Sequence, residues 1–201
     1  MEQEMDLKID AMRPDDWEQV KAIYWEGILT GNATFEAQVA EWEKWDSSHV
    51  VAPRFVIRNG SQIAGWAALS RVSARQVYAG VAEVSIYMGD KYRGQGLGSS
   101  LFSSFIRASE EKGFWTLQAG IFPENVISIE FHRKHGFRIL GVREKVGKMT
   151  FGELKGKWRN ACGRPALSHG LAGTEKYSGE TEPCRCELPA YGVPHDRDSP
   201  I

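Results

Sequence analysis

The chain has 201 residues and a formal net charge of −1; 42% of its residues are hydrophobic and 11% are aromatic. This size and composition are those of one globular domain that can bury its own core. A balanced charge provides no positive field to attract a phosphate backbone, so nucleic acid is not expected as a partner.

Targeting signals and cysteines add further exclusions. The first six residues are acidic where a signal peptide would be basic and then apolar, and no run of 18 apolar residues occurs. We therefore expect a cytoplasmic protein with no membrane partner. Cys162, Cys184 and Cys186 all fall in the last forty residues, which predicts a core without cysteine or disulfide. No His, Asp or Glu cluster has metal-ligand spacing, so no metal is expected.

The first ninety residues predict alternating strands and helices. Pro14 followed by two aspartates is a typical helix start, and Asn59 with Gly60 suits a tight hairpin turn. Apolar periodicity places the other elements. In chain order we expect a strand at 8–12, a helix with Trp17, Val20, Ile23 and Tyr24, a polar loop at 27–35, a helix with Val39 and the core residues Trp42 and Trp45, hairpin strands at 54–58 and 62–69, and a strand at 82–88.

A glycine-rich turn at 93–98 lies between the strand at 82–88 and a predicted helix at 99–112. Unpaired amides at a helix start attract anions, and glycines let a phosphate approach the backbone closely. No Lys-Ser/Thr pair follows the last glycine, which excludes a P-loop, and the turn lies too late in the chain for a dinucleotide fold. The turn therefore predicts an anionic cofactor, although an ordinary connection between a strand and a helix has the same spacing.

The second half predicts a strand at 116–122, a helix at 125–135 and a strand at 137–142. From residue 160 the pattern changes. The last 42 residues hold five Pro and five Gly but only five residues among Leu, Ile, Val, Phe and Met. We therefore expect a domain at 1–159 and a disordered tail at 160–201.

Two motifs carry a resemblance to a known family. Arg93-x-x-Gly96-x-Gly98, together with Asn125-x-x-Ser128-x-x-Phe131-His132-x-x-x-Gly136-Phe137, resembles the signature segments of the GNAT acetyltransferase superfamily. Segments 31–35, 42–46, 82–87 and 122–125 resemble its phosphinothricin and methionine sulfoximine acetyltransferase branch, over about residues 7–159. The resemblance implies an α/β fold with a twisted mixed sheet, splayed in the middle, flanked by helices and open to acetyl-CoA.

The resemblance also implies how acetyl-CoA is held. Amides of the turn would bind the pyrophosphate, and the strand backbone at 86–88 would pair with the pantetheine arm. Asn125 and Ser128 would line the other side, although Asn125 is equally placed to cap the helix that follows it, and both roles can coexist. The residues implied for the cofactor are Ile86, Tyr87, Met88, Arg93, Gly94, Gln95, Gly96, Leu97, Gly98, Ser99, Asn125 and Ser128.

Two residues are candidates for the chemistry of acetyl transfer. Glu83 lies in an otherwise apolar strand, where an ionised carboxylate needs a partner or a task, and the resemblance implies that it is the general base. The alternative is a strand glutamate that faces solvent. His132 would protonate the leaving thiolate or orient the substrate, and the alternative is a histidine packed beside Phe131 and Ile129. His135 is expected to be structural.

The resemblance places the substrate near the loop at 70–80. Arg75, with Arg71 as a second possibility, would bind an acidic group, and Phe35 and Tyr78 would wall the pocket. The alternative for either arginine is a solvated loop charge. The implied reaction is direct transfer of acetyl to the amino group of a small acidic amino-acid analogue by a homodimer. Another amine, such as an arsenic-containing amino acid or a protein N-terminus, and a non-catalytic acetyl-CoA-binding module are the alternatives.

The chain departs from the family after Arg159. Relatives continue with Asp and an apolar final strand, whereas this chain continues with Asn160, Ala161 and Cys162. We therefore expect the usual last strand to be missing. An altered reading frame, a replaced terminus and a genuine extension all remain open as the origin of this segment.

Overall fold

The computed structural model describes residues 7–163 and 167–168. The larger sheet has the strand order β1-β2-β3-β4-β5-β8, and β6 pairs with β7 in a second sheet. Neighbouring strands of the larger sheet run antiparallel, except β4 and β5, which run parallel. The strands are β1 (Leu7–Ala11), β2 (His49–Asn59), β3 (Gln62–Arg71), β4 (Val81–Met88), β5 (Thr116–Gln118), β6 (Gly141–Lys148), β7 (Trp158–Gly163) and β8 (Leu167–Ser168).

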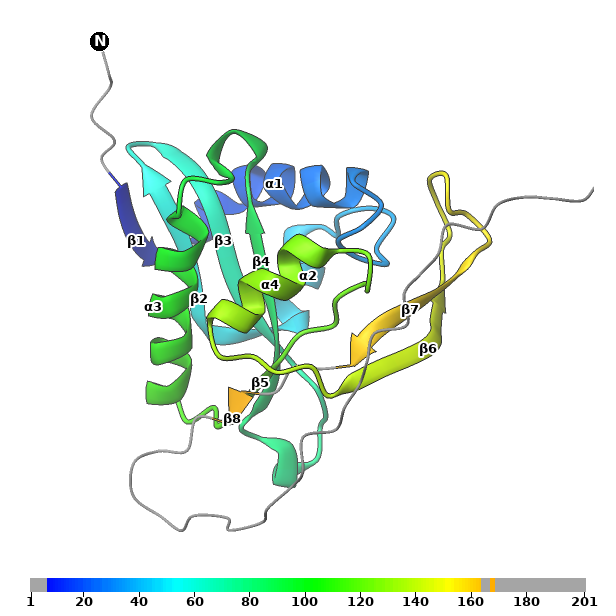
Figure 1. Cartoon of the computed structure of the whole chain (residues 1–201). Coiled ribbons are helices and arrows are strands. Elements are labelled where there is room, and N and C mark those ends of the chain that lie inside the picture. The colour runs from blue at the N-terminus through cyan, green and yellow to red at the C-terminus, as the bar shows by residue number, and fades with distance from the viewer. Residues whose placement is uncertain (1–6, 164–166, 169–201) are drawn as a thin grey trace, which may run out of the picture.

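Helices cover both faces of the larger sheet (Figure 1). They are α1 (Trp17–Leu29), α2 (Trp42–Ser48), α3 (Leu97–Glu111) and α4 (Val126–Lys134), with short 3-10 turns η1 (Pro14–Asp16), η2 (Gln76–Tyr78) and η3 (Asp90–Tyr92). None of the helices in the described residues has the length and apolarity to cross a membrane. The expected order of strands and helices is confirmed through α4.

The alternation of β3 explains why the sheet has two cores. Trp66 and Ala68 pack with the tryptophans of α1 and α2, whereas Ala67 and Leu69 pack against α3. Successive strand residues point to opposite faces, so one apolar strand supplies both layers. The predicted core role of Trp45 is confirmed, because only 3% of its surface is exposed.

Two predicted strands have different limits in the structure. The strand expected at 116–122 ends at Gln118, because the chain there parts from β4; Ile121 then forms only an isolated bridge with Cys162. The strand expected at 137–142 begins at Gly141 instead. Phe137 is buried and its amide donates to the carbonyl of His132, so this residue closes α4 and does not begin a strand.

The expectation of a missing last strand is wrong, because β7 occupies residues 158–163 and pairs antiparallel with β6. The amide of Cys162 also donates to the carbonyl of Ile121 at 2.7 Å. Ala161 and Cys162 are small enough to fill this buried position, so the core does contain a cysteine. The tail prediction is likewise wrong for residues 160–163 and 167–168; Cys184, Cys186 and the rest of the tail lie outside the described residues.

Candidate active site

The larger sheet splits between β4 and β5. These strands pair from Val81 with Thr116 to Glu83 with Gln118, and the pairing then stops. Beyond Glu83, β4 continues to Met88 while still paired with β3 on its other side. The backbone edge of β4 after Glu83 therefore faces an opening. The expected splay is present, and the segment 86–88 predicted to pair with pantetheine lies along it.

The glycine-rich turn follows β4 at the wide end of this opening. Gly94 and Gly96 have φ angles of +75° and +80°, a left-handed conformation that side chains with a Cβ rarely adopt. The turn is exposed, and the amides of residues 95–98 have no backbone acceptor within the described residues. Arg93 braces the turn: its Nε donates to the carbonyl of Met88, and its guanidinium pairs with Asp90. These amides fit a pyrophosphate.

Ser99 differs from the other predicted turn donors. Its amide donates to the carbonyl of Gly96 at 3.0 Å, as does the amide of Ser100 at 3.3 Å. Gly96 is the N-cap residue of α3, so both bonds belong to the first turn of that helix. Leu97, another residue predicted to hold the cofactor, has a buried side chain that packs in the core. Only its backbone amide is therefore available to a cofactor.

Glu83 lies at the narrow end of the opening. Its side chain is half-buried, and Gln118 Nε2 donates to Glu83 Oε2 at 3.4 Å. Gly120 lies beside the carboxylate, since a Cβ on that glycine would be 3.7 Å from Glu83 Oε1. By alternation, Glu83 shares a sheet face with Tyr87, which packs with the aromatic residues of the α1 and α2 layer. The carboxylate therefore lies beside Gln118 and Gly120 at the end of the β4 and β5 pairing and does not simply face water.

His132 lies on α4 among aromatic side chains, including Phe102 and Phe137, and only 3% of its surface is exposed. Its Nδ1 donates to the carbonyl of Ser128 at 2.8 Å, and its Nε2 is buried with no hydrogen-bond partner among the described residues. Burial lowers the pKa of His132 to about 4. The neutral ring therefore carries its proton on Nδ1, and Nε2 can accept a proton but cannot donate one. This geometry favours packing or orientation over the predicted role as the acid.

Asn125 and Ser128 form the start of α4. Asn125 Oδ1 accepts from the amide of Ser128 at 3.2 Å, which confirms the predicted helix cap. Asn125 Nδ2 also donates to the carbonyl of Asn32 at 2.9 Å and so reaches the loop after α1. Asn125 therefore joins the helix on one side of the opening to a loop on the other.

The predicted substrate residues fall in three places. Arg75 and Tyr78 are exposed on η2 and its flank, with the guanidinium 5.7 Å from the centre of the ring. Arg71, also exposed, ends β3 and pairs in register with Ala82, next to Glu83. Phe35 lies apart, in edge-to-face contact with Phe122 at 4.8 Å. The structure thus brings Arg75 to Tyr78, Arg71 to the Glu83 end of β4, and Phe35 to the segment before α4.

Sequence reasoning missed three polar residues around these positions. Gln118 is buried beside Glu83, Asn32 accepts from Asn125, and Arg159 is buried and bonded to Asn32. A glutamine in a short apolar strand was the available signal for Gln118. Asn32 lies in a segment that resembles the family, and Arg159 marks the point where the chain departs from it, but neither local pattern reveals a contact over this chain distance.

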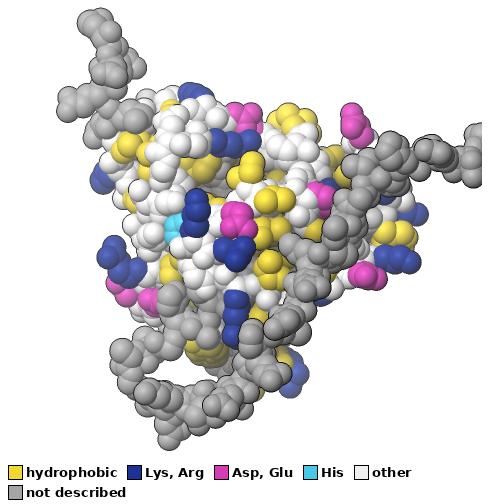
Figure 2. Space-filling model, in the orientation of Figure 1, with side chains coloured by type: hydrophobic (Ala, Val, Ile, Leu, Met, Phe, Trp, Pro, Cys, Tyr) yellow, Lys and Arg dark blue, Asp and Glu magenta, His cyan; other side chains and the backbone are white. Residues whose placement is uncertain are grey.

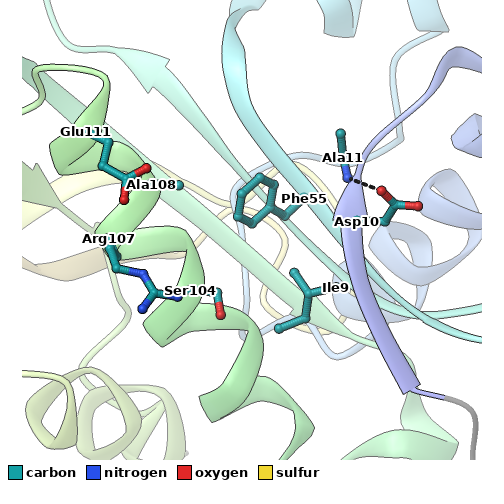
Figure 3. A pocket seen from close by; sticks show the side chains of 8 residues that line it. All are labelled: Ile9, Asp10, Ala11, Phe55, Ser104, Arg107, Ala108 and Glu111. Atoms are coloured by element: carbon teal, nitrogen blue, oxygen red, sulfur yellow. Dashed lines mark hydrogen bonds between the residues drawn. The ribbon is translucent and has the colours of Figure 1, made fainter.

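An open groove elsewhere on the molecule has a volume of about 560 Å³. Figure 3 shows Ile9 of β1 facing Arg107 and Ala108 of α3, with Phe55 between them. Because β2 and β3 separate β1 from β4 in the sheet, this groove is not the opening beside Glu83. On the face over α4, Figure 2 shows basic and acidic side chains interspersed with apolar ones. Within the described residues, no group of three His, Cys, Asp or Glu could hold a metal ion.

Comparison with known proteins agrees with this geometry. The acetyltransferase (GNAT) family matches residues 17–137. YwnH of Bacillus subtilis, a relative named for phosphinothricin acetylation, is 32% identical over 139 residues, covering 67% of this chain and 85% of YwnH. The methionine sulfoximine and methionine sulfone acetyltransferase of Pseudomonas aeruginosa is 32% identical over 87 residues, covering 43% of this chain and 51% of that protein.

Solved structures agree as well. A phosphinothricin acetyltransferase from Sinorhizobium meliloti, solved in complex with acetyl-CoA, superposes with a TM-score of 0.70 at 25% identity, covering 87% of this chain and 95% of that one. The chain therefore belongs to the acetyltransferase (GNAT) family and is an N-acetyltransferase related to the phosphinothricin and methionine sulfoximine enzymes.

Proposed function

We propose that the protein transfers the acetyl group of acetyl-CoA to the amino group of a small acidic amino-acid analogue of the phosphinothricin or methionine sulfoximine type. The observation that carries this proposal is the position of Glu83, at the point where β4 and β5 part. The turn amides of residues 95–98, which have no backbone acceptor in the described part of the chain, lie at the other end of the same strand edge. A thioester held by that turn and edge would extend toward this carboxylate.

Glu83 acts as the general base. It removes a proton from the amine, directly or through one water, and the amine nitrogen forms a bond to the thioester carbonyl carbon. A backbone amide near Tyr87 or Met88 polarises the carbonyl oxygen. The carbon–sulfur bond then breaks, and the thiolate takes up a proton. Since His132 Nε2 has no proton to give in the neutral form, that proton comes from another donor, such as water.

Arg75 and Arg71 provide the recognition of acid groups. A guanidinium binds a carboxylate or phosphinate through two parallel hydrogen bonds, and neither arginine has an ion-pair partner among the described residues. Tyr78, beneath Arg75, restricts the rotamers of that side chain. Phe35 provides an apolar wall on the other side. We propose in addition that the protein acts as a cytoplasmic homodimer.

The test is thiol release with acetyl-CoA and a panel of phosphinothricin, methionine sulfoximine, neutral amino acids and an N-terminal peptide. We expect the acidic analogues to give the highest kcat/KM. Glu83→Gln should lower kcat by about a hundredfold or more, because it removes the base but keeps the size. The exposed Glu144→Gln on β6 is the matched control. Equal kcat in Glu83→Gln and the wild type would refute the mechanism.

A second arm addresses recognition of the acid. Arg75→Ala should raise the KM for the acidic amine about tenfold while leaving acetyl-CoA affinity unchanged, since only the acid group loses a partner. If acetyl-CoA raises the melting temperature but no amine releases thiol, the protein is a non-catalytic binding module and the proposal fails.

A further inference from the structure

We infer that Arg159 of β7 is a positioning residue that fixes the loop at 31–35 to the segment at 122–125 and so sets the shape of the substrate side of the site. It does not belong to the candidate catalytic or binding residues. The effect on substrate rests on the proposed function, whereas the effect on the loop does not.

The guanidinium of Arg159 is bonded on several sides. Its Nη1 donates to the carbonyl of Gly31 at 2.7 Å, and its Nη2 donates to Asn32 Oδ1 and to Glu124, each at 2.8 Å. The guanidinium also lies 3.7 Å from the centre of the Phe122 ring. One side chain from β7 thus holds two segments that are far apart in sequence.

Because Arg159 is buried, the loss of any of these contacts would be costly in free energy. Only 5% of the Arg159 surface is exposed, so loss of one acceptor would leave part of a desolvated guanidinium without a hydrogen bond. The planar fork of arginine can reach the acceptors on the loop and Glu124 at the same time, which the single point charge of a lysine cannot. The loop is therefore held in one arrangement by the geometry of the guanidinium.

The same loop is tied to the cofactor side. The carbonyl of Asn32 accepts from Asn125 Nδ2, and Asn125 Oδ1 caps α4. Asn32 therefore receives hydrogen bonds from two residues, Arg159 through its side chain and Asn125 through its backbone. A shift of Asn32 would therefore move both the loop at 31–35 and the start of α4.

The candidate pocket wall is fixed by the neighbouring strand. Arg159 pairs in register with Gly147 of β6, and a Cβ on that glycine would lie 2.6 Å from Phe35 Cε1. Phe35 also contacts Phe122, the ring beneath Arg159. Gly147 of the β6 and β7 pair therefore lies close against one side of the Phe35 ring, while Arg159 fixes the loop that carries this residue. Through these contacts Arg159 sets the position of the Phe35 side chain.

The experiment compares Arg159→Met with the wild type by hydrogen exchange and by kinetics. Arg143→Met is the matched control, because Arg143 is an exposed arginine on the adjacent strand. We expect exchange to rise selectively at residues 31–35, with α3 unchanged. The KM for the amine should rise about tenfold, with kcat changed less than about threefold and the Kd of acetyl-CoA less than about twofold. Arg159→Lys should recover only part of the loss.

Asn32→Ala keeps the proposal testable if Arg159→Met does not fold. It removes one acceptor from a half-buried loop residue, and we expect the same selective change in exchange with an increase in amine KM of about threefold. Unchanged exchange at 31–35, or an increase spread equally over α3, would overturn the inference. If the wild type acetylates none of the amines, the proposed function fails, and exchange at 31–35 still decides the role of Arg159.

Discussion

The turn at 93–98 and the loop at 31–35 lie on two sides of the candidate site but are held in different ways. The turn is closed by Arg93 to Met88 and Gln95 to Lys91, contacts that span five and four positions of the chain. The loop is held by Asn125 and Arg159, which lie 93 and 127 positions from Asn32. One region is closed by its neighbours in sequence, whereas the other depends on the finished fold.

This difference predicts that acetyl-CoA binding and amine binding can be altered independently. A turn with local contacts and left-handed glycines presents its amides once β4 and α3 are formed. The loop, in contrast, takes its position only when β7 has packed against the sheet. Changes in the turn should therefore alter acetyl-CoA binding with little effect on the amine, and changes near the loop should do the reverse.

The largest expected effect concerns His132, on α4, the helix that begins at the Asn125 cap. Its pKa is about 4 in the folded protein and about 6.5 when unfolded, so the unfolded state binds more protons between these values. Stability should be complete above pH 6.5 and fall by on the order of 3 kcal/mol as the pH drops to 4. Denaturant unfolding of the wild type and His132→Leu from pH 7.5 to 4.5 measures this contribution.

Replacing His132 by leucine should make the pH dependence shallower, because the proton uptake on unfolding is removed. His49 is also buried enough to have a lowered pKa, but it is present in both proteins and cancels in the comparison. Parallel stability curves for the two proteins would show that His132 titrates normally and that the packing argument is wrong.

The next prediction distinguishes the loss of stability caused by backbone strain from the loss of acetyl-CoA affinity at the turn. Gly96 and Gly113 have φ angles of +80° and +84°, and a Cβ on either meets no atom within 4 Å. Gly96→Ala and Gly113→Ala should therefore cost similar stability, about 1 kcal/mol each. Only Gly96→Ala should weaken acetyl-CoA binding, by about thirtyfold or about 2 kcal/mol, because its methyl group enters the phosphate cradle.

Calorimetric titration of acetyl-CoA with both variants provides the measurement. Equal affinities in the two proteins would mean that the turn at 93–98 does not form the phosphate site, and the contrast between the two regions would lose its basis.

The smallest effect is expected at Gly147. Gly147→Ala would place a methyl group against Phe35, whose ring must then shift toward the pocket. We expect the KM for the amine to rise about fivefold, with the Kd of acetyl-CoA unchanged, since small displacements of a positioning group reduce binding. Steady-state kinetics with both substrates tests this. If Gly147→Ala instead weakened the affinity for acetyl-CoA, the loop and the turn would not act independently, and the prediction would be wrong.

Much of the site could be predicted because its signals are local. The Asn125 cap and the glycine turn follow from a few adjacent residues, and both are present. The burial of His132 and the lack of a proton on its Nε2 could not be predicted, since they depend on rings from α3 and from the segment after α4. The strand at 158–163 was missed because Ala161 and Cys162 have no strand pattern of their own.

The sequence by itself determined the elements that close locally: the helix starts, the hairpin at Asn59 and Gly60, and the turn whose glycines permit positive φ angles. Only the tertiary structure decided where β4 and β5 part beside Glu83, and that Arg159 holds the loop of Asn32. The physical reason is that hydrogen bonds and backbone angles within a few residues are written in the local sequence. A buried charge finds its acceptors only when distant segments have packed around it.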